Sequence, residues 1–226
     1  MGRDKSHSAY YLSRAVAVGG RKNMDEKIIA DIVKQILHDL PNQAPKSDMP
    51  DKNKQTSNFK SPKEVGIGIG PAYGDKIQYT INGLPHDKVL KEIMAGIEEE
   101  GMIPKVYRIM HTSDVSFIGN DVAKLVGSGV GIGLQSKGTA VIHQKDLYPL
   151  TNLELFPQAP LITLETYRQI GKNAAKYAKG EQVIPIPIQN DPMCRPKYQV
   201  KSALMHTIET ELVVERGEPI LITTLM

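Results

Sequence analysis

Two runs of alternating glycines are the first features of this chain that could carry chemistry. They read Gly-Ile-Gly-Ile-Gly over residues 66–70 and Gly-Ser-Gly-Val-Gly-Ile-Gly over residues 127–133. The dinucleotide-binding fingerprint requires a third glycine where these runs have Pro71 and Ile132. Alternating glycines also let a neighbouring layer or a ligand approach a strand closely. We expect a packed layer over residues 66–70, and both interpretations stay open for residues 127–133.

The remaining reactive side chains form no recognisable catalytic or metal-binding motif. The histidines of the globular part are scattered along the sequence: His86, His111, His143 and His206. None of them has the short spacing to a second histidine or to a cysteine pair that is typical of metal sites. The single cysteine, Cys194, has no base partner at a recognisable spacing, so we interpret it as a small buried residue. The sequence therefore predicts neither a catalytic residue nor a metal site.

Composition indicates a globular protein that binds neither nucleic acid nor a membrane. Hydrophobic residues make up 40% and charged residues 23% of the 226 residues, and the net charge is only +3. There is no tryptophan, and aromatic residues for stacking on bases are few. One cysteine excludes an internal disulfide and is typical of a reducing cytosol. No apolar run approaches the roughly 18 residues of a membrane span.

Strands and helices alternate from about residue 64 onward. The hydrophobic pattern predicts strands over residues 65–69, 105–110, 130–134 and 139–143, and helices over residues 87–100, 114–126 and 163–179. Lys137 and Gly138 form the turn between the last two strands. Residues 98–100, three glutamates, are typical of a solvated helix end. This alternation favours an α/β fold with a sheet flanked by helices.

The N-terminal part is organised differently. Residues 24–40 carry an apolar stripe at helical spacing and predict an amphipathic helix. Residues 41–63 are rich in polar residues and proline, and predict a flexible linker. A helix on such a tether is expected to dock away from the main core. Residues 64–226 form the globular α/β domain.

Residues 1–23 carry five basic residues against one acidic residue. A transit peptide is one interpretation, because such segments are basic and poor in acids. Alternatively Met24 is the true start, since residues 19–21 can be encoded by a ribosome-binding sequence. We favour this second interpretation and treat residues 1–23 as a non-native or mis-started extension without function.

Long segments of the chain resemble the medium subunit of adenosylcobalamin-dependent diol and glycerol dehydratases. The resemblance covers the chain from about residue 65 and is carried by segments whose sequences are rare. These are residues 84–86 (Leu-Pro-His), 97–101 (Ile-Glu-Glu-Glu-Gly), 112–117 (Thr-Ser-Asp-Val-Ser-Phe), 128–139, 141–144 (Val-Ile-His-Gln), 152–160, 163–175 and 195–198 (Arg-Pro-Lys-Tyr). Residues 191–194 (Asp-Pro-Met-Cys) depart from the family pattern before Arg195.

The resemblance implies a Rossmann-like domain that covers the lower face of the corrin, while a large barrel subunit holds the substrate and a potassium ion. It implies no catalytic residue in this chain. The residues that it implies for cofactor binding are Asp114, Lys137, Thr139, Leu150, Asn152, Pro157, Arg195 and Ser202. Because the D-x-H-x-x-G motif is absent, the cofactor is expected to bind base-on, with its own dimethylbenzimidazole as lower ligand.

These residue types suit a corrin. Its rim carries amides, which need donors and acceptors such as Thr139 and Ser202. Its nucleotide tail carries a phosphate, which Lys137 or Arg195 would neutralise. Without the resemblance, we would interpret Lys137 as a residue of an exposed turn, and each of the other positions would likewise have a purely structural interpretation.

The resemblance further implies a hydro-lyase made of large, medium and small subunits, paired into a dimer of heterotrimers. Propane-1,2-diol, converted to propionaldehyde, is the expected substrate. The basis is that residues 24–40 resemble the extension that directs diol dehydratases to the shell of a bacterial microcompartment in the cytoplasm. Three alternatives remain: a glycerol dehydratase medium subunit, the small subunit of a dehydratase-reactivating chaperone, and an α/β binding module without cobalamin.

Overall fold

The computed structural model describes residues 60–223. The predicted extension over residues 1–23, the helix over residues 24–40 and most of the linker over residues 41–63 lie outside the described residues. The last linker residues are held by the globular part. The Lys60 ammonium donates to the carbonyl of Lys124 at 2.8 Å, and the Ile103 amide donates to the carbonyl of Lys63 at 2.8 Å.

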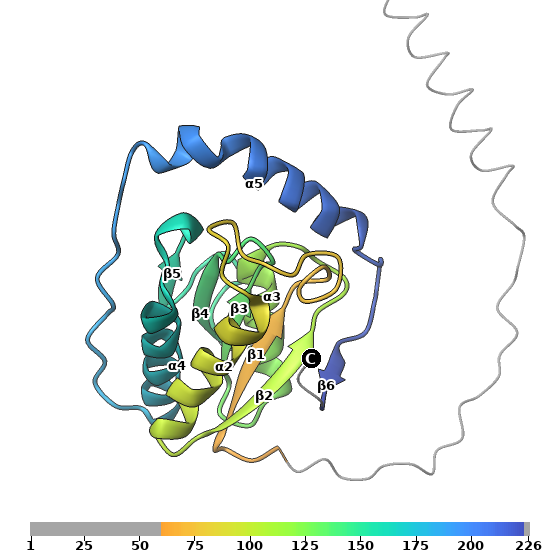
Figure 1. Ribbon diagram of the computed structural model, residues 1–226. Helices are drawn as coiled ribbons and strands as arrows, with labels where there is room; N and C mark the ends of the chain where they lie inside the picture. The colour runs from red at the N-terminus through yellow and green to blue at the C-terminus, as the bar shows by residue number, and fades with distance from the viewer. Residues whose placement is uncertain (1–59, 224–226) are drawn as a thin grey trace, which may run out of the picture. The chain divides into compact units, whose positions relative to one another are not determined.

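The described residues form an α/β unit (Figure 1). Along the chain the elements are β1 (Glu64–Ile69), α2 (His86–Glu99), β2 (Ile103–Arg108), α3 (Val115–Leu125), β3 (Val130–Leu134), β4 (Ala140–Gln144), β5 (Glu154–Phe156), the 3-10 helix η1 (Ala159–Leu161), α4 (Leu164–Lys179), α5 (Cys194–Glu211) and β6 (Ile220–Ile222). Every strand and helix predicted from residue 64 onward is present, with ends shifted by two residues or fewer.

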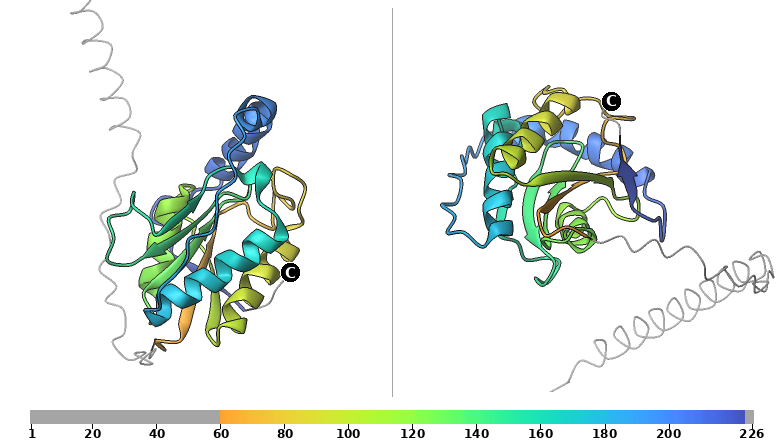
Figure 2. Two further views of the ribbon diagram at one scale, coloured as in Figure 1. Left: turned by 90° about the vertical axis from the view of Figure 1, so that its left-hand side faces the viewer. Right: turned by 90° about the horizontal axis from the view of Figure 1, so that it is seen from below.

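The strands form one six-stranded sheet in the order β5-β4-β3-β1-β2-β6. The three central strands, β3, β1 and β2, are parallel, and β4, β5 and β6 each pair antiparallel to their neighbours. Parallel strands need helices on the faces of the sheet to connect them. Accordingly α2 and α4 cover one face and α3 covers the other (Figure 2). The predicted α/β class, with a sheet flanked by helices, is confirmed.

The alternating glycines divide the two faces of the central strands. In β1, Val65, Ile67 and Ile69 belong to the core cluster under α2 and α4, whereas Gly66 and Gly68 face α3. A Cβ added at Gly66 would lie 2.7 Å from a methyl group of Val122, which is closer than packed atoms approach.

The second glycine run has the same function. A Cβ at Gly131 would lie 2.6 Å from Val122 Cγ1, and one at Gly133 would lie 2.7 Å from the backbone nitrogen of Gly119. Four glycines of the two runs, Gly66, Gly68, Gly131 and Gly133, therefore pack against α3, whereas Gly127 lies against the backbone of Ser61 and Gly129 against the Lys145 side chain. For residues 127–133 the structure thus supports the packing interpretation.

The opposite face is closed by apolar side chains and by a belt of charges. Buried residues of α2 and α4 pack on the sheet: Val89, Leu90, Ile93, Ile97, Tyr167, Ile170 and Ala174. At the outer rim, Arg168 pairs with Glu92 and Glu99, and Lys179 pairs with Glu100 at 2.9 Å. The glutamates over residues 98–100 are thus more than a solvated helix end, because two of them connect α2 to α4.

The sequence did not predict α5. It follows an irregular stretch over residues 180–193 and lies across the carboxyl ends of the central strands (Figure 1). Its buried residues are Cys194, Met205 and Glu209. Met205 packs with Ala72, Ile77, Ile81 and Ala159 in a second, smaller core. Within residues 60–223, none of the helices combines the length and apolar character that crossing a bilayer requires.

Candidate functional site

The sheet has its topological switch point between β1 and β3, because the chain leaves these adjacent strands toward opposite sides. Ligands of open α/β sheets bind in the crevice outside the carboxyl ends of such strands. In this chain a glutamate of α5 fills that crevice. Glu209 is 1% exposed, and its Oε1 accepts from the Ser136 amide at 3.0 Å and from the Ser136 hydroxyl at 2.7 Å. The same carboxylate lies against Gly70, where any side chain would collide with it. This carboxylate occupies the place in the crevice where such folds bind a nucleotide phosphate.

A pocket of about 500 Å³ opens beside this crevice. One wall is α5, and the other consists of the turn after β3 and the segment around η1. Five of the residues implied for cofactor binding line this pocket: Lys137, Thr139, Pro157, Arg195 and Ser202. They come from three regions that are far apart in the sequence, and the fold brings them to one cavity.

Asp114, Leu150 and Asn152 do not line this pocket. Asp114 caps α3, since its carboxylate accepts from the amides of Ser116 and Phe117 at 2.8 and 3.2 Å. Leu150 is 60% exposed and Asn152 is half-buried, both in the loop between β4 and β5. The structure therefore separates the implied residues into a pocket group and an outer group.

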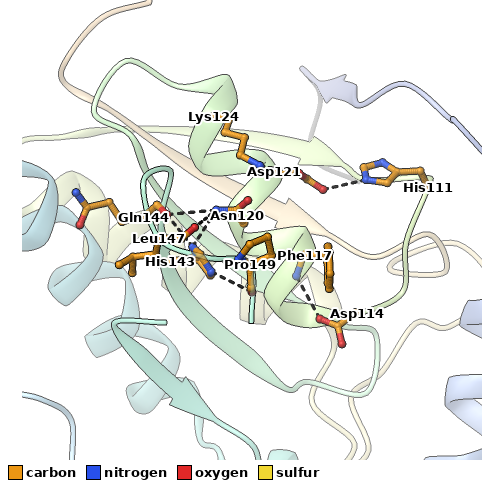
Figure 3. A network of polar contacts seen from close by, with 10 residues as sticks. All are labelled: His111, Asp114, Phe117, Asn120, Asp121, Lys124, His143, Gln144, Leu147 and Pro149. Carbon is orange, nitrogen blue, oxygen red and sulfur yellow. Dashed lines mark hydrogen bonds and ion pairs between the residues drawn. The ribbon is translucent and has the colours of Figure 1, made fainter. Parts of the chain in front are cut away.

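The loop that carries Leu150 is held by a buried polar network (Figure 3). Asn120 on α3 donates to the carbonyls of Gln144 and Leu147 at 3.3 and 3.2 Å. The ring of His143, which is fully buried, contacts the carbonyl of Pro149 through Nε2 at 3.2 Å. These contacts fix the loop up to the residue before Leu150.

Figure 3 also shows a contact between His111 and Asp121 on α3. His111 Nε2 lies 2.9 Å from Asp121 Oδ2. Lys124 lies 3.6 Å from the other carboxylate oxygen. Within residues 60–223, no cluster of three or more histidine, cysteine, aspartate or glutamate residues is placed to hold a metal ion.

Thr139 has an unsatisfied hydroxyl at the pocket. Its side chain is 6% exposed, and Oγ1 has no hydrogen-bond partner among the described residues. Leaving a buried hydroxyl unpaired costs about 1–3 kcal/mol. A polar ligand in the pocket would supply the missing partner.

Lys137 is a half-buried cation in the same pocket. Burial lowers the pKa of its ammonium, and the carboxylates of Glu209 and Asp114 offset part of this effect. Among the described residues, the Lys137 ammonium has no hydrogen bond and no ion pair with any side chain. A half-buried cation that no carboxylate contacts directly is the arrangement expected of a site for an anionic group.

The backbone of the turn that carries Lys137 is held from several sides. His86 Nε2 contacts the carbonyl of Ser136 at 2.8 Å, the Ile81 amide donates to the carbonyl of Lys137 at 3.0 Å, and the Tyr167 hydroxyl donates to the carbonyl of Gly138 at 2.6 Å. His86 also stacks on Tyr73 with ring centroids 3.8 Å apart, and burial lowers its pKa to about 4. The ring is therefore neutral near pH 7, with Nε2 as the donor to Ser136.

Several pocket residues were not predicted, and most of them lie on α5. Tyr198, Gln199 and His206 line the pocket together with Arg195 and Ser202. These positions recur every three or four residues, which places them on one face of a helix. Recognising α5 as a helix would have been enough to find them.

Comparison with known proteins adds a family match. A family described as dehydratase medium subunit matches residues 70–183. Among solved structures, the chain is similar to a glycerol dehydratase reactivase, with 19% identity over 56% of this chain and 96% of that chain, at a TM-score of 0.43. It is also similar to a diol dehydratase-reactivating factor solved with ADP and Mg²⁺, with 22% identity over 56% of this chain and 97% of that chain, at a TM-score of 0.41.

Proposed function

The chain belongs to the dehydratase medium subunit family, and from this premise we propose that it holds adenosylcobalamin in a diol dehydratase. Family membership makes it a subunit of a hydro-lyase complex. The proposal adds the cofactor, the substrate and the residues that would contact them.

One observation carries the proposal. Five residues implied by the resemblance converge on one pocket, and this pocket contains both an unpaired buried hydroxyl and an unpaired cation. A corrin rim offers amides that would satisfy Thr139 and Ser202. The nucleotide tail offers a phosphate for Lys137 and Arg195. The residues present therefore fit this cofactor.

The work of this chain is to bind and orient the cofactor. Lys137 and Arg195 lie on opposite walls of the pocket and would clamp one anionic group between them. Pro157 and the ring of Tyr198 would cover apolar parts of the ligand and exclude water. Adenosylcobalamin would supply the radical chemistry when bound, while the polar side chains of this chain would fix its position.

The proposed assembly contains a large subunit, which would hold the substrate and the potassium ion, and a small subunit, in a dimer of heterotrimers. Propane-1,2-diol is the proposed substrate, with glycerol as the alternative. The proposed location is a bacterial microcompartment, reached through residues 24–40.

Reconstitution tests this function. The chain is produced with and without its large and small subunits, and cobalamin is detected by its absorption spectrum after gel filtration. We expect cobalamin in the assembled complex, turnover of propane-1,2-diol by that complex, and no turnover by the isolated chain. An assembled complex that neither binds cobalamin nor dehydrates either diol would refute the proposal.

The Lys137 ammonium provides the sharpest single test of the binding mode. A charge-assisted hydrogen bond contributes roughly 1.5–3 kcal/mol, so Lys137→Ala should weaken cobalamin binding on the order of tenfold to a hundredfold. Lys137→Arg should recover part of the loss, because it restores the charge with a different geometry. Cobalamin affinity of the three complexes at matched salt decides this. Equal affinity of wild type and Lys137→Ala would make Lys137 a solvated turn residue.

A further inference from the structure

The turn over residues 136–138 joins β3 to β4 and places two pocket residues, Lys137 and Thr139. Its carbonyls are bonded to His86, Ile81 and Tyr167, as described above. The amide and hydroxyl of Ser136 point the other way, toward α5, and both donate to Glu209. These two bonds are the polar connection between the turn and the helix that forms the other wall of the pocket.

Glu209 is an unusual anchor, because its carboxylate is almost completely buried. Burial raises the pKa of this carboxyl, while the bonds from Ser136 and the charge of Lys137 oppose that rise. A buried carboxylate is unfavourable unless it is hydrogen-bonded and close to a cation. Here Ser136 supplies the hydrogen bonds, and Lys137, the next residue, supplies the charge.

We propose that Glu209 is a positioning residue for the pocket: by binding Ser136, it fixes the turn so that Lys137 faces the ligand and α5 closes the opposite wall. The inference deepens the proposed function and rests on it for the identity of the ligand. Glu209 itself does not line the pocket, so it acts through the turn.

Three variants of the full chain test this role. Glu209→Ala removes both acceptors for Ser136. Glu209→Gln keeps an acceptor oxygen at the same distance from the helix but removes the charge. Lys137→Ala, alone and combined with Glu209→Ala, reports whether the two residues act together.

The first measurement does not depend on cobalamin. Hydrogen exchange of the Ser136 amide in the full chain should become about tenfold faster or more in Glu209→Ala, since its bond to the carboxylate is lost. Glu209→Gln should exchange close to the wild-type rate. Unchanged exchange in Glu209→Ala would overturn the inference, and so would a Gln variant that exchanges like the Ala variant.

The second measurement is cobalamin affinity of the assembled complex. Glu209→Ala should weaken binding about tenfold, and its effect should shrink when Lys137 is already Ala, because residues that act as a unit are not additive. A general loss of stability would instead lower affinity equally in both backgrounds. Additive effects, or wild-type affinity in Glu209→Ala, would contradict the positioning role.

Glu154 provides a matched control. It is also a buried glutamate, and its carboxylate accepts from the Asn173 side chain and the Ile186 amide, both at 2.8 Å. It does not line the pocket, so Glu154→Ala should lower stability without changing Ser136 exchange or cobalamin affinity. If the wild-type complex fails to bind cobalamin, the proposed function fails, whereas Ser136 exchange still decides whether Glu209 fixes the turn.

Discussion

The Thr139 hydroxyl is expected to lower the stability of the free protein and to strengthen ligand binding. Its buried hydroxyl has no partner among the described residues, yet it lines the pocket. Such a group lowers the stability of the free chain and becomes useful only when a ligand binds to it. An unpaired buried polar group of this kind is typical of a binding site, where affinity is gained at some loss of stability.

Thr139→Val should therefore change stability and affinity in opposite directions. Valine has nearly the same shape without the hydroxyl, so the free energy of unfolding of the free chain should rise by about 1 kcal/mol. Cobalamin affinity of the complex should fall several-fold. Chemical denaturation and a binding titration measure the two effects. Thr207→Val, on the exposed side of α5, is the control and should leave affinity unchanged. Unchanged affinity in Thr139→Val would argue against a ligand contact.

His86 makes stability depend on pH. Burial, the largest cause, lowers its pKa to about 4 from the ordinary 6.5. The unfolded chain therefore binds a proton more readily than the folded chain between these values. The stabilisation is fully present above about pH 6.5 and is lost as the pH falls toward 4.

The expected loss is at most about 3 kcal/mol, from 1.36 kcal/mol per pKa unit. The free energy of unfolding of wild type and His86→Gln should be compared between pH 7 and pH 4.5. The difference between the two should shrink as the pH falls, because only the wild type has this group, while the opposing titration of Glu209 is common to both. Parallel curves would show that the neutral ring is not the source of the pH dependence.

At the scale of elements, α3 packs closely on β1 and β3 because glycines leave one face of these strands without side chains. β1 and β3 alternate branched residues toward α2 and α4 with glycines toward α3, so that backbone packs on backbone. Gly133 has the tightest environment of the β3 glycines, because a Cβ added there would come closest to an α3 atom, the Val115 carbonyl oxygen.

Gly133→Ala should be costly for this reason. The added Cβ would collide with the Val115 carbonyl oxygen and lie 2.7 Å from the Gly119 nitrogen, and overpacking costs about 1–3 kcal/mol. Gly101→Ala is the control: its φ of +74° disfavours alanine by roughly 1–2 kcal/mol, but no atom lies near the added carbon. Denaturant unfolding should give the larger loss for Gly133→Ala. A smaller loss would mean that α3 can move away at little cost.

Most elements could be predicted because their own residues carry a periodic pattern. The four longer strands, the three sheet-covering helices and the Lys137–Gly138 turn belong to this class, whereas the three-residue strands β5 and β6 were not predicted. The glycine runs were harder, because a sequence indicates that something approaches a strand but does not say what. For residues 66–70 the packing interpretation was preferred, and for residues 127–133 only the structure decided it.

α5 could not be predicted because its pattern contradicts its burial. Val200, Leu204 and Ile208 are exposed, while Glu209 is buried. Pro196 lies in the first turn, which is compatible with a helix start but does not identify one. The reason for burying Glu209 is Ser136, 73 residues earlier, and no local pattern reports such a contact. Of the pocket residues on α5, Arg195 and Ser202 were expected through the family resemblance, while Tyr198, Gln199 and His206 were missed.

At the scale of the molecule, the sheet, its helices and both cores lie within the described residues 60–223. The predicted targeting helix and most of its linker lie outside these residues. Folding and targeting should therefore be separable by truncation.

Removal of residues 1–59 tests this separation. The truncated chain should assemble with its partner subunits and keep dehydratase activity, because the pocket and the cores are untouched. The complex should be more soluble and should spread through the cytosol instead of collecting in microcompartments. An enzyme assay and fluorescence microscopy of a tagged complex measure the two properties. Loss of activity in the assembled truncated complex would show that residues 1–59 are needed for catalysis.

The two edges of the sheet have a consequence for how this subunit meets others. β5 closes one edge and β6 the other, and each is only three residues long. Long free edges invite pairing with strands of other chains, in productive assembly as well as in fibrils. Edges this short offer a partner too few backbone groups for a continuous sheet across a subunit boundary. Among the described residues, the short edges therefore disfavour growth of the sheet from chain to chain, and we expect the proposed partner subunits to be recognised through side chains on helices and loops.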